Sequence, residues 1–298
     1  MKPFDVAIIG GGPAGIAAAI QLSRSGRTII LFEGERIGGM LSCANLIENY
    51  PGFEGGIRGE ELAAIFQKQL AEHPVTIVKS WVTSLEYDST AYTVHSELKT
   101  IQSASVIVAS GTKAKALINL ELPNNGHAMI SDTVAPVSNV TNKHIAIIGS
   151  GDAAFDYALN LSRKNEVTVF CRTETVTCLP LLSERASSDP SINCVMNSLV
   201  QSVKYLKGSK LKLDYSNGRA DSELEVDYLI TAIGREARLD FLSERILKQS
   251  DQLRASKRYH LIGDATGTEC RQTAIAVGQG VKAAMEINIA MNERESCK

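Results

Sequence analysis

Phe4-Asp5-Val6-Ala7-Ile8-Ile9-Gly10-Gly11-Gly12-Pro13-Ala14-Gly15 decides the fold of this chain, because it reads as an apolar strand running into a glycine-rich turn. The alanine-rich residues 16–22 then predict a helix. In this arrangement Gly10 permits the turn, Gly12 lets the backbone approach a pyrophosphate, and Gly15 lets the helix pack closely on the strand. The helix N-terminus offers unpaired N–H groups and a positive dipole end to the same phosphates.

A second apolar strand, residues 28–32, ends at Glu33. A carboxylate at the end of that strand can accept hydrogen bonds from the adenosine ribose hydroxyls of a dinucleotide. A glycine turn kept only for packing would not require this acid. Strand, turn, helix and acid together therefore predict dinucleotide binding.

Length and composition limit the remaining possibilities. A chain of 298 residues is long enough for two domains, and its 44% hydrophobic content is ordinary for a globular protein. The 33 acidic and 31 basic residues leave no strong field, so neither nucleic acid nor a membrane is favoured as a partner. We expect a cytoplasmic protein without a secretory signal or membrane span. The six cysteines show neither C-x-x-C nor metal-ligand spacing, so we expect reduced thiols and no metal site.

The rest of the first half reads as further α/β structure. Residues 59–72 predict an amphipathic helix, and the alternation from 75 to 108 predicts short antiparallel strands. Within that stretch Trp81 is interpreted as a packing residue. A buried strand then meets the turn Ala109-Ser110-Gly111.

The opening pattern recurs in the second half. A strand at 143–148 enters Gly149-Ser150-Gly151-Asp152-Ala153-Ala154, and a helix is predicted at 155–161. The next strand, 166–170, is followed by Cys171 and Arg172 rather than by an acid. A cation at this place favours a 2′-phosphate and hence NADPH, although a solvated surface charge explains Arg172 equally well.

The final part of the chain predicts a hairpin region at 187–225 and a buried strand at 227–233. A strand near residue 260 then delivers Asp264 to a turn, and a helix is predicted at 274–291. Such an arrangement can hold a polyol and direct a helix N-terminus at an electron-rich ring.

Together these motifs resemble the thioredoxin reductase-like branch of the pyridine nucleotide-disulfide oxidoreductase superfamily, a group of flavoproteins with two dinucleotide sites. The resemblance implies an α/β fold with two Rossmann-like domains, each of three ββα layers, and a homodimer. It also implies that the NAD(P) domain, residues 116–236, is inserted in a discontinuous FAD domain, residues 1–115 and 237–298.

The resemblance implies two sets of cofactor-binding residues. The FAD set is Gly10, Gly12, Pro13, Ala14, Gly15, Glu33, Gly34, Gly39, Met40, Leu41, Asn49, Val82, Ala109, Ser110, Gly111, Gly263, Asp264, Arg271, Gln272 and Thr273. The set for NADPH or NADH is Gly149, Gly151, Asp152, Ala153, Arg172, Ile233, Gly234 and Arg235.

The chain departs from the family pattern in its thiols and arginines. Disulfide reductases of this family carry a C-x-x-C pair shortly before the second glycine motif, where residues 128–135 contain no cysteine. A relative that reduces small disulfides has a cysteine in the first motif, where Ala14 stands. The family's adjacent arginines are reduced to Arg172. Cys43 and Cys270 are the candidate single redox thiols, with a structural role favoured for both.

The function expected is therefore an FAD-dependent oxidoreductase that takes hydride from NAD(P)H. Its acceptor is not an internal disulfide but a small electron carrier, as in the similar thioredoxin reductase-type ferredoxin–NADP reductases, or a quinone, dioxygen or small molecule. Two alternatives stay open. One is a flavin-dependent oxidase that no longer uses nicotinamide, and the other is a flavin-binding regulatory or assembly protein with little turnover.

Overall fold

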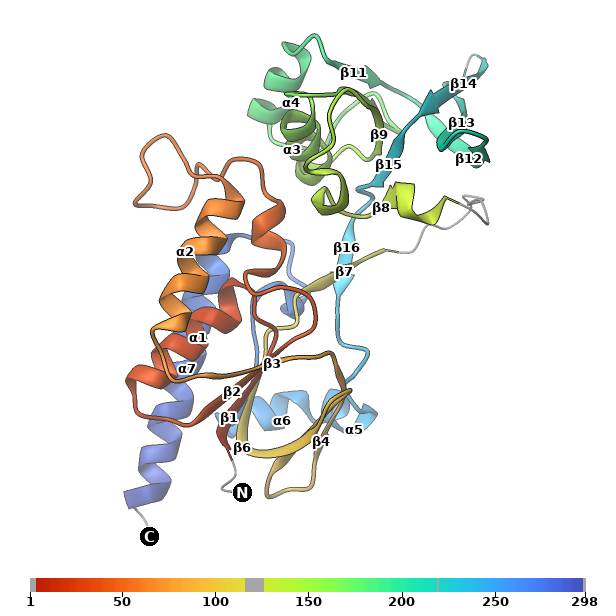
Figure 1. Ribbon diagram of the computed structural model, residues 1–298. Helices are drawn as coiled ribbons and strands as arrows, with labels where there is room; N and C mark the ends of the chain where they lie inside the picture. The colour runs from red at the N-terminus through yellow and green to blue at the C-terminus, as the bar shows by residue number, and fades with distance from the viewer. Residues whose placement is uncertain (1–3, 116–125, 219, 297–298) are drawn as a thin grey trace. The chain divides into compact units, whose positions relative to one another are not determined.

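The computed structural model describes residues 4–115, 126–218 and 220–296 and divides them into two compact units (Figure 1). Unit 1 contains residues up to Ser42, Ile47–Lys113 and Glu236 onward. Unit 2 contains Ala114–Arg235 together with the short segment Cys43–Leu46. At the two main crossings, β7 (Thr112–Ala114) and β16 (Arg235–Ala237) pair as a two-stranded sheet.

Unit 1 is built on a seven-stranded sheet ordered β3-β2-β1-β6-β5-β4, with β17 beside β6. Its parallel strands are β1 (Phe4–Ile9), β2 (Ile29–Glu33), β3 (Thr76–Lys79), β6 (Thr100–Val108) and β17 (Tyr259–Leu261). The antiparallel strands are β4 (Val82–Tyr87) and β5 (Tyr92–Ser96), which join the amino-terminal part of β6.

The expectation of antiparallel strands throughout 75–108 is wrong for β3. This strand pairs in parallel with β2, with Ile30 opposite Thr76. A crossover through helix α2 (Gly59–Ala71) brings it back in the same direction as β2, and such a crossover makes a parallel pair. Four residues alone carry no pattern that distinguishes the two directions.

Three layers stack in unit 1. Helices α1 (Pro13–Arg24), α2 and α7 (Thr273–Ser296) cover one face of the sheet (Figure 1). The core between them contains buried aliphatic side chains from β1, β2, α1 and α7. On the other face, β4 and β5 enclose a second core with α5 (Glu244–Lys248) and α6 (Ser250–Ala255). Short 3₁₀ turns, η1 (Gly39–Cys43) and η4 (Gly263–Thr266), complete the unit's connections.

Unit 2 repeats this plan around a five-stranded parallel sheet ordered β11-β10-β9-β15-β8. The strands are β8 (Ile130–Ser131), β9 (His144–Ile148), β10 (Glu166–Phe170), β11 (Ile192–Val195) and β15 (Tyr228–Thr231). Unit 2 also contains the helices α3 (Asp152–Leu161) and α4 (Pro180–Ser187) and the 3₁₀ turns η2 (His127–Met129) and η3 (Ala135–Val137).

The remaining layer of unit 2 is an antiparallel sheet of β12 (Leu199–Leu206), β13 (Lys210–Ser216) and β14 (Asp221–Val226). Its apolar side chains share a core with those of the parallel sheet. The predicted pairing of 211–213 with 224–226 is confirmed, with Leu213 opposite Leu224. The prediction of a hairpin region over the whole of 187–225 is wrong at β11, because this strand pairs in parallel with β10.

Helices α1 and α7 cross at a point where backbone meets backbone. A Cβ atom on Gly280 would lie 2.2 Å from the carbonyl oxygen of Ala14. Two residues earlier in the same helix, a Cβ on Gly278 would meet no atom within 4 Å. The two glycines therefore separate a packing requirement from helix propensity.

We expect Gly280→Ala to destabilise the protein by about 1–3 kcal/mol, since the methyl group must push the helices apart. Gly278→Ala should instead stabilise it by about 0.5–1 kcal/mol, because alanine loses less backbone entropy in a helix. Chemical denaturation of both variants provides the measurement. Equal stabilities would show that the helices do not approach this closely.

Candidate functional site

The three motif glycines of the first turn have different surroundings. Gly10 has φ +106°, and a Cβ there would lie 2.2 Å from the carbonyl oxygen of Ala109. A Cβ on Gly15 would lie 1.9 Å from the carbonyl oxygen of Gly10. Around Gly12, by contrast, a Cβ would meet no atom of the described chain within 4 Å. Gly10 and Gly15 are thus required by packing, whereas Gly12 borders open space at the N-terminus of α1.

Glu33 is held beside this turn by the backbone. One carboxylate oxygen accepts the N–H of Gly11 at 2.7 Å, and the other accepts the N–H of Glu35 at 2.8 Å. An ionised carboxylate has about four lone-pair sites, so both oxygens can accept further donors such as ribose hydroxyls. The open side of Gly12, the free helix terminus and this oriented acid fit the adenosine and pyrophosphate of a dinucleotide.

Other residues predicted to bind FAD are brought together from distant parts of the chain. The Asn49 side chain donates to Gln272 Oε1 at 2.8 Å, joining a loop near residue 50 to the start of α7. Gly263, at φ +64°, packs against α1, where its Cβ would lie 3.0 Å from that of Ala14. Its N–H donates to Gln279 Oε1 at 2.6 Å.

The other members of that set lie on turns and element ends. Arg271 donates to the carbonyl of Thr268, and the Val82 side chain packs against the core. The set also includes Gly39, Met40 and Leu41 in η1, Asp264 in η4, Thr273 as the first residue of α7, and Gly34 directly after β2.

The second glycine turn is built similarly, but the loop that contains Thr177 and Cys178 is hydrogen-bonded to it. A Cβ on Gly149 would lie 2.4 Å from the carbonyl oxygen of Ala232. The backbone N–H groups of Thr177 and Cys178 donate to the Ser150 carbonyl at 2.8 and 3.1 Å. A Cβ on Gly151 would lie 3.7 Å from the Thr177 hydroxyl, which is an ordinary van der Waals contact, so the loop lies beside this glycine without filling its space.

Asp152 fastens the same loop. It is the first residue of α3, and its carboxylate accepts the backbone N–H of Leu179 at 2.8 Å. A negative charge at this helix terminus opposes a phosphate there while completing the loop's anchorage. Ala153 follows it in α3, and Arg172 lies exposed at the start of the anchored loop.

Residues after β15 complete the second predicted set. Ile233 is exposed, Gly234 has φ +110°, and the Arg235 guanidinium pairs with Asp132 at 3.2 Å. Asp132 lies in the 128–135 segment in which disulfide reductases of this type carry their cysteines. A charged pair occupies this part of unit 2.

Asp156 on α3 is a half-buried acid that sequence reasoning missed. Its carboxylate accepts the backbone N–H of Asn45 at 2.8 Å and also that of Leu46, and Arg163 donates to the Asn45 side chain at 2.9 Å. Burial raises the pKa of Asp156 to about 6 despite these hydrogen bonds. The segment Cys43–Leu46 is therefore anchored within unit 2 by a carboxylate that titrates near neutrality.

The cysteines within the described residues form no disulfide and lie in different surroundings. Cys43 is buried in unit 2, and Cys270 is exposed in unit 1. Burial raises the pKa of Cys171 to about 11 and also raises the pKa values of Cys178 and Cys194. Because the thiolate is the nucleophile, these three thiols of unit 2 are poorly suited to disulfide exchange at neutral pH.

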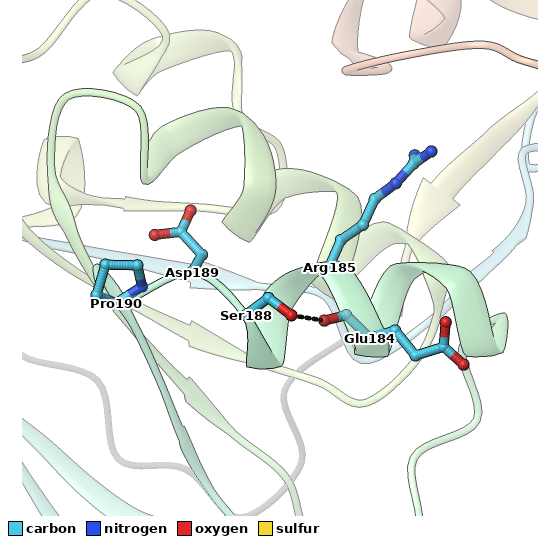
Figure 2. Close-up of a pocket in the computed structure, with 5 residues that line it drawn as sticks. All are labelled: Glu184, Arg185, Ser188, Asp189 and Pro190. Carbon is cyan, nitrogen blue, oxygen red and sulfur yellow. Dashed lines mark hydrogen bonds between the residues drawn. The ribbon is translucent and has the colours of Figure 1, made fainter.

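A surface depression on unit 2 is lined by residues outside the glycine turn. Figure 2 shows these side chains. Its lining residues come from α4 and the turn that precedes β11, which is the amino-terminal edge of the parallel sheet; they are Glu184, Arg185, Ser188, Asp189 and Pro190. Dinucleotides bind at the carboxyl edge of such sheets. The Ser188 hydroxyl donates to the Glu184 carbonyl, and Asp189 accepts from Ser162 and Ser191. We assign this depression no chemistry.

Comparison with known proteins agrees with this geometry. Residues 4–286 match the family model described as pyridine nucleotide-disulphide oxidoreductase. The chain belongs to this family. It is 31% identical to a thioredoxin reductase of Streptomyces coelicolor, over 95% of this chain and 92% of that protein. It is 30% identical to the mitochondrial thioredoxin reductase 1 of Arabidopsis thaliana, over 96% and 83%.

Among solved structures, the thioredoxin reductase of Lactococcus lactis in its FR conformation matches 97% of this chain and 99% of its own. The TM-score is 0.85 at 26% identity. The predicted α/β fold with two Rossmann-like domains and the thioredoxin reductase-like resemblance are confirmed. In the part of the chain that the structure describes, no helix is long and apolar enough to cross a membrane, and no cluster of side chains suits a metal.

Proposed function

We propose that this family member is an FAD-dependent NAD(P)H oxidoreductase whose electrons leave to an acceptor other than an internal disulfide. The observation that carries the proposal is a first dinucleotide cradle kept open at Gly12, in a chain without any C-x-x-C pair. Bound flavin would supply the two-electron chemistry, and the protein would supply binding and orientation. The names of its relatives favour thioredoxin as a partner, and the thiols argue against it.

FAD would be held by chain groups already oriented for it. The N–H groups at the start of α1 would face the pyrophosphate, and Glu33 would accept from the adenosine ribose. The Asn49–Gln272 hydrogen bond joins two residues of the predicted FAD set, so that this part of the site is tied together before a ligand arrives. Pre-ordering of this kind lowers the entropic cost of binding.

The thiols of the chain limit the routes by which electrons can leave the flavin. Disulfide reduction needs an attacking thiolate and a resolving partner at covalent range. Residues 128–135 supply Asp132, paired with Arg235, and no thiol. Acceptors that need no protein disulfide remain, namely a small electron-carrier protein, a quinone, dioxygen or a small molecule. The single Arg172, without a second arginine beside it, favours as the alternative an oxidase that no longer uses nicotinamide.

A homodimer and a cytoplasmic location remain predictions from the sequence. Exposed apolar side chains on α7 support the dimer, since large apolar residues gathered on one element are typical of interfaces; they are Ile275, Met285 and Ile289.

Replacing Gly12 should separate flavin binding from folding. Gly12→Val should weaken FAD binding by roughly 100-fold, because the branched side chain enters the open space assigned to the pyrophosphate. The unfolding midpoint of the flavin-free protein should stay unchanged, since a Cβ there meets no neighbour. Gly278→Val, at another glycine whose Cβ would meet nothing, is the control and should bind FAD normally. Retention of FAD by Gly12→Val would refute the site.

Anaerobic mixing with NADPH or NADH tests the activity itself. Rapid bleaching of the flavin band is expected, without turnover of thioredoxin or an aromatic disulfide, and Cys43→Ser should leave bleaching unchanged. Disulfide turnover that disappears in Cys43→Ser or Cys270→Ser would instead place the redox thiols on those loops. A flavin that no nicotinamide bleaches would favour the oxidase or the low-turnover regulatory or assembly protein.

Arg172 should confer a modest preference for NADPH. One exposed guanidinium can pair with a 2′-phosphate at about 1 kcal/mol, which is roughly a fivefold preference. Arg172→Ala should remove that preference and leave the rate with NADH nearly unchanged, as measured by flavin reduction in stopped flow. Equal rates of the unmodified protein with both nucleotides would make Arg172 a surface charge.

A further inference from the structure

Trp81, the single tryptophan of the chain, lies directly against the backbone of Gly34. A Cβ on Gly34 would be only 2.2 Å from the Trp81 indole. The backbone N–H of Ser80 donates to the Glu33 carbonyl at 3.0 Å, which joins the turns after β2 and β3. The indole is thus placed one residue from the acid assigned to the adenosine ribose.

Arg238 stacks on this indole. Its guanidinium carbon lies 4.4 Å from the ring centroid of Trp81, well inside the range of a cation–π contact. Its backbone is fixed to the turn after β6, since its N–H donates to the Gly111 carbonyl at 3.0 Å. Its carbonyl accepts the Ser110 hydroxyl at 2.7 Å.

The stacked pair reaches across the carboxyl edge of the sheet. Trp81 follows β3 and Arg238 is bound to the turn after β6, while the sheet order is β3-β2-β1-β6. The ends of β2 and β1, with Glu33 and the glycine turn, lie between those two strands. This edge is where a dinucleotide binds in such sheets, with its adenosine toward the strand that carries the acid.

We propose that Arg238, oriented by Trp81, forms a wall of the adenine end of the FAD site and contacts the purine, an inference that rests on the proposed function. A guanidinium plane stacks on an aromatic face, and its N–H groups donate to ring nitrogens, so it suits adenine on both counts. Trp81 is a positioning residue, because its indole restricts the plane that the guanidinium adopts. Gly34 is required because any side chain there would displace the indole.

The test measures the affinities of the full-length, flavin-free chain for FAD, ADP and FMN. Arg238→Ala should weaken FAD and ADP by about tenfold and leave FMN, which lacks adenosine, unchanged. Arg238→Lys should be intermediate because it keeps the charge and loses the plane. Trp81→Phe should retain binding, and Trp81→Leu should behave like Arg238→Ala. Arg24→Ala, which removes an exposed charge in the last turn of α1, is the control.

Fluorescence of Trp81 gives a readout that does not depend on activity. ADP should change the emission of the unmodified chain, and this change should be lost in Arg238→Ala. Unchanged FAD and ADP affinities in Arg238→Ala would overturn the inference while leaving the proposed function intact. Equal weakening of ADP and FMN would overturn it too, since the pair would then be only a structural strut. A chain that binds neither FAD nor ADP would overturn both.

Discussion

The close approach of three backbone segments at the end of β1 is the constraint on which unit 1 depends. The Ala109 carbonyl occupies the space that a side chain on Gly10 would need, and the Gly10 carbonyl occupies that of Gly15. One layer further out, the Ala14 carbonyl excludes any side chain from Gly280. Because each contact involves backbone, no rotamer change can relieve it. The N-terminus of α1 is therefore set at a fixed place above the sheet edge.

The glycine turns and the strands leading into them were predictable from sequence, because the signals are local. Residues 4–9 and 144–148 are apolar runs that end in glycine, and both became central strands. Trp81 is a packing residue, as the sequence predicted, and lies against Gly34. Its stacking with Arg238 was not predictable, because the two residues are distant in sequence. The grouping of Cys43–Leu46 with unit 2 depends on a hydrogen bond to Asp156. Asp156 is far away in the sequence, so no local motif spacing could predict this contact. The predicted cofactor residues themselves remain predictions.

The cysteines are poorly suited to disulfide exchange, whereas the first glycine turn keeps the space that a dinucleotide cofactor needs. An exchange site needs a thiolate, yet burial holds Cys171 protonated, with a pKa near 11. Cys178 and Cys194 have raised pKa values for the same reason. The first glycine turn, by contrast, remains open, because a Cβ on Gly12 would meet no described atom within 4 Å. Retaining the space for a cofactor without the thiols is consistent with electrons that leave the protein directly from that cofactor.

The two glycine turns differ most in what lies beside their helix termini. At the first, the acid stands at the end of the next strand and accepts from Gly11, so its charge lies toward the ribose end. At the second, the acid is Asp152 on the helix itself, and it is committed to the Leu179 N–H. A phosphate bound there would meet a carboxylate at close range, and the helix dipole would have to serve both charges. The loop bound by Asp152 also carries Arg172 at its start, so the same hydrogen bond that adds negative charge to the cradle orders the segment that holds the compensating cation. On the proposed function, Asp152 would act on a nucleotide bound to unit 2 in two opposing ways, through repulsion at the phosphate and through the placement of Arg172.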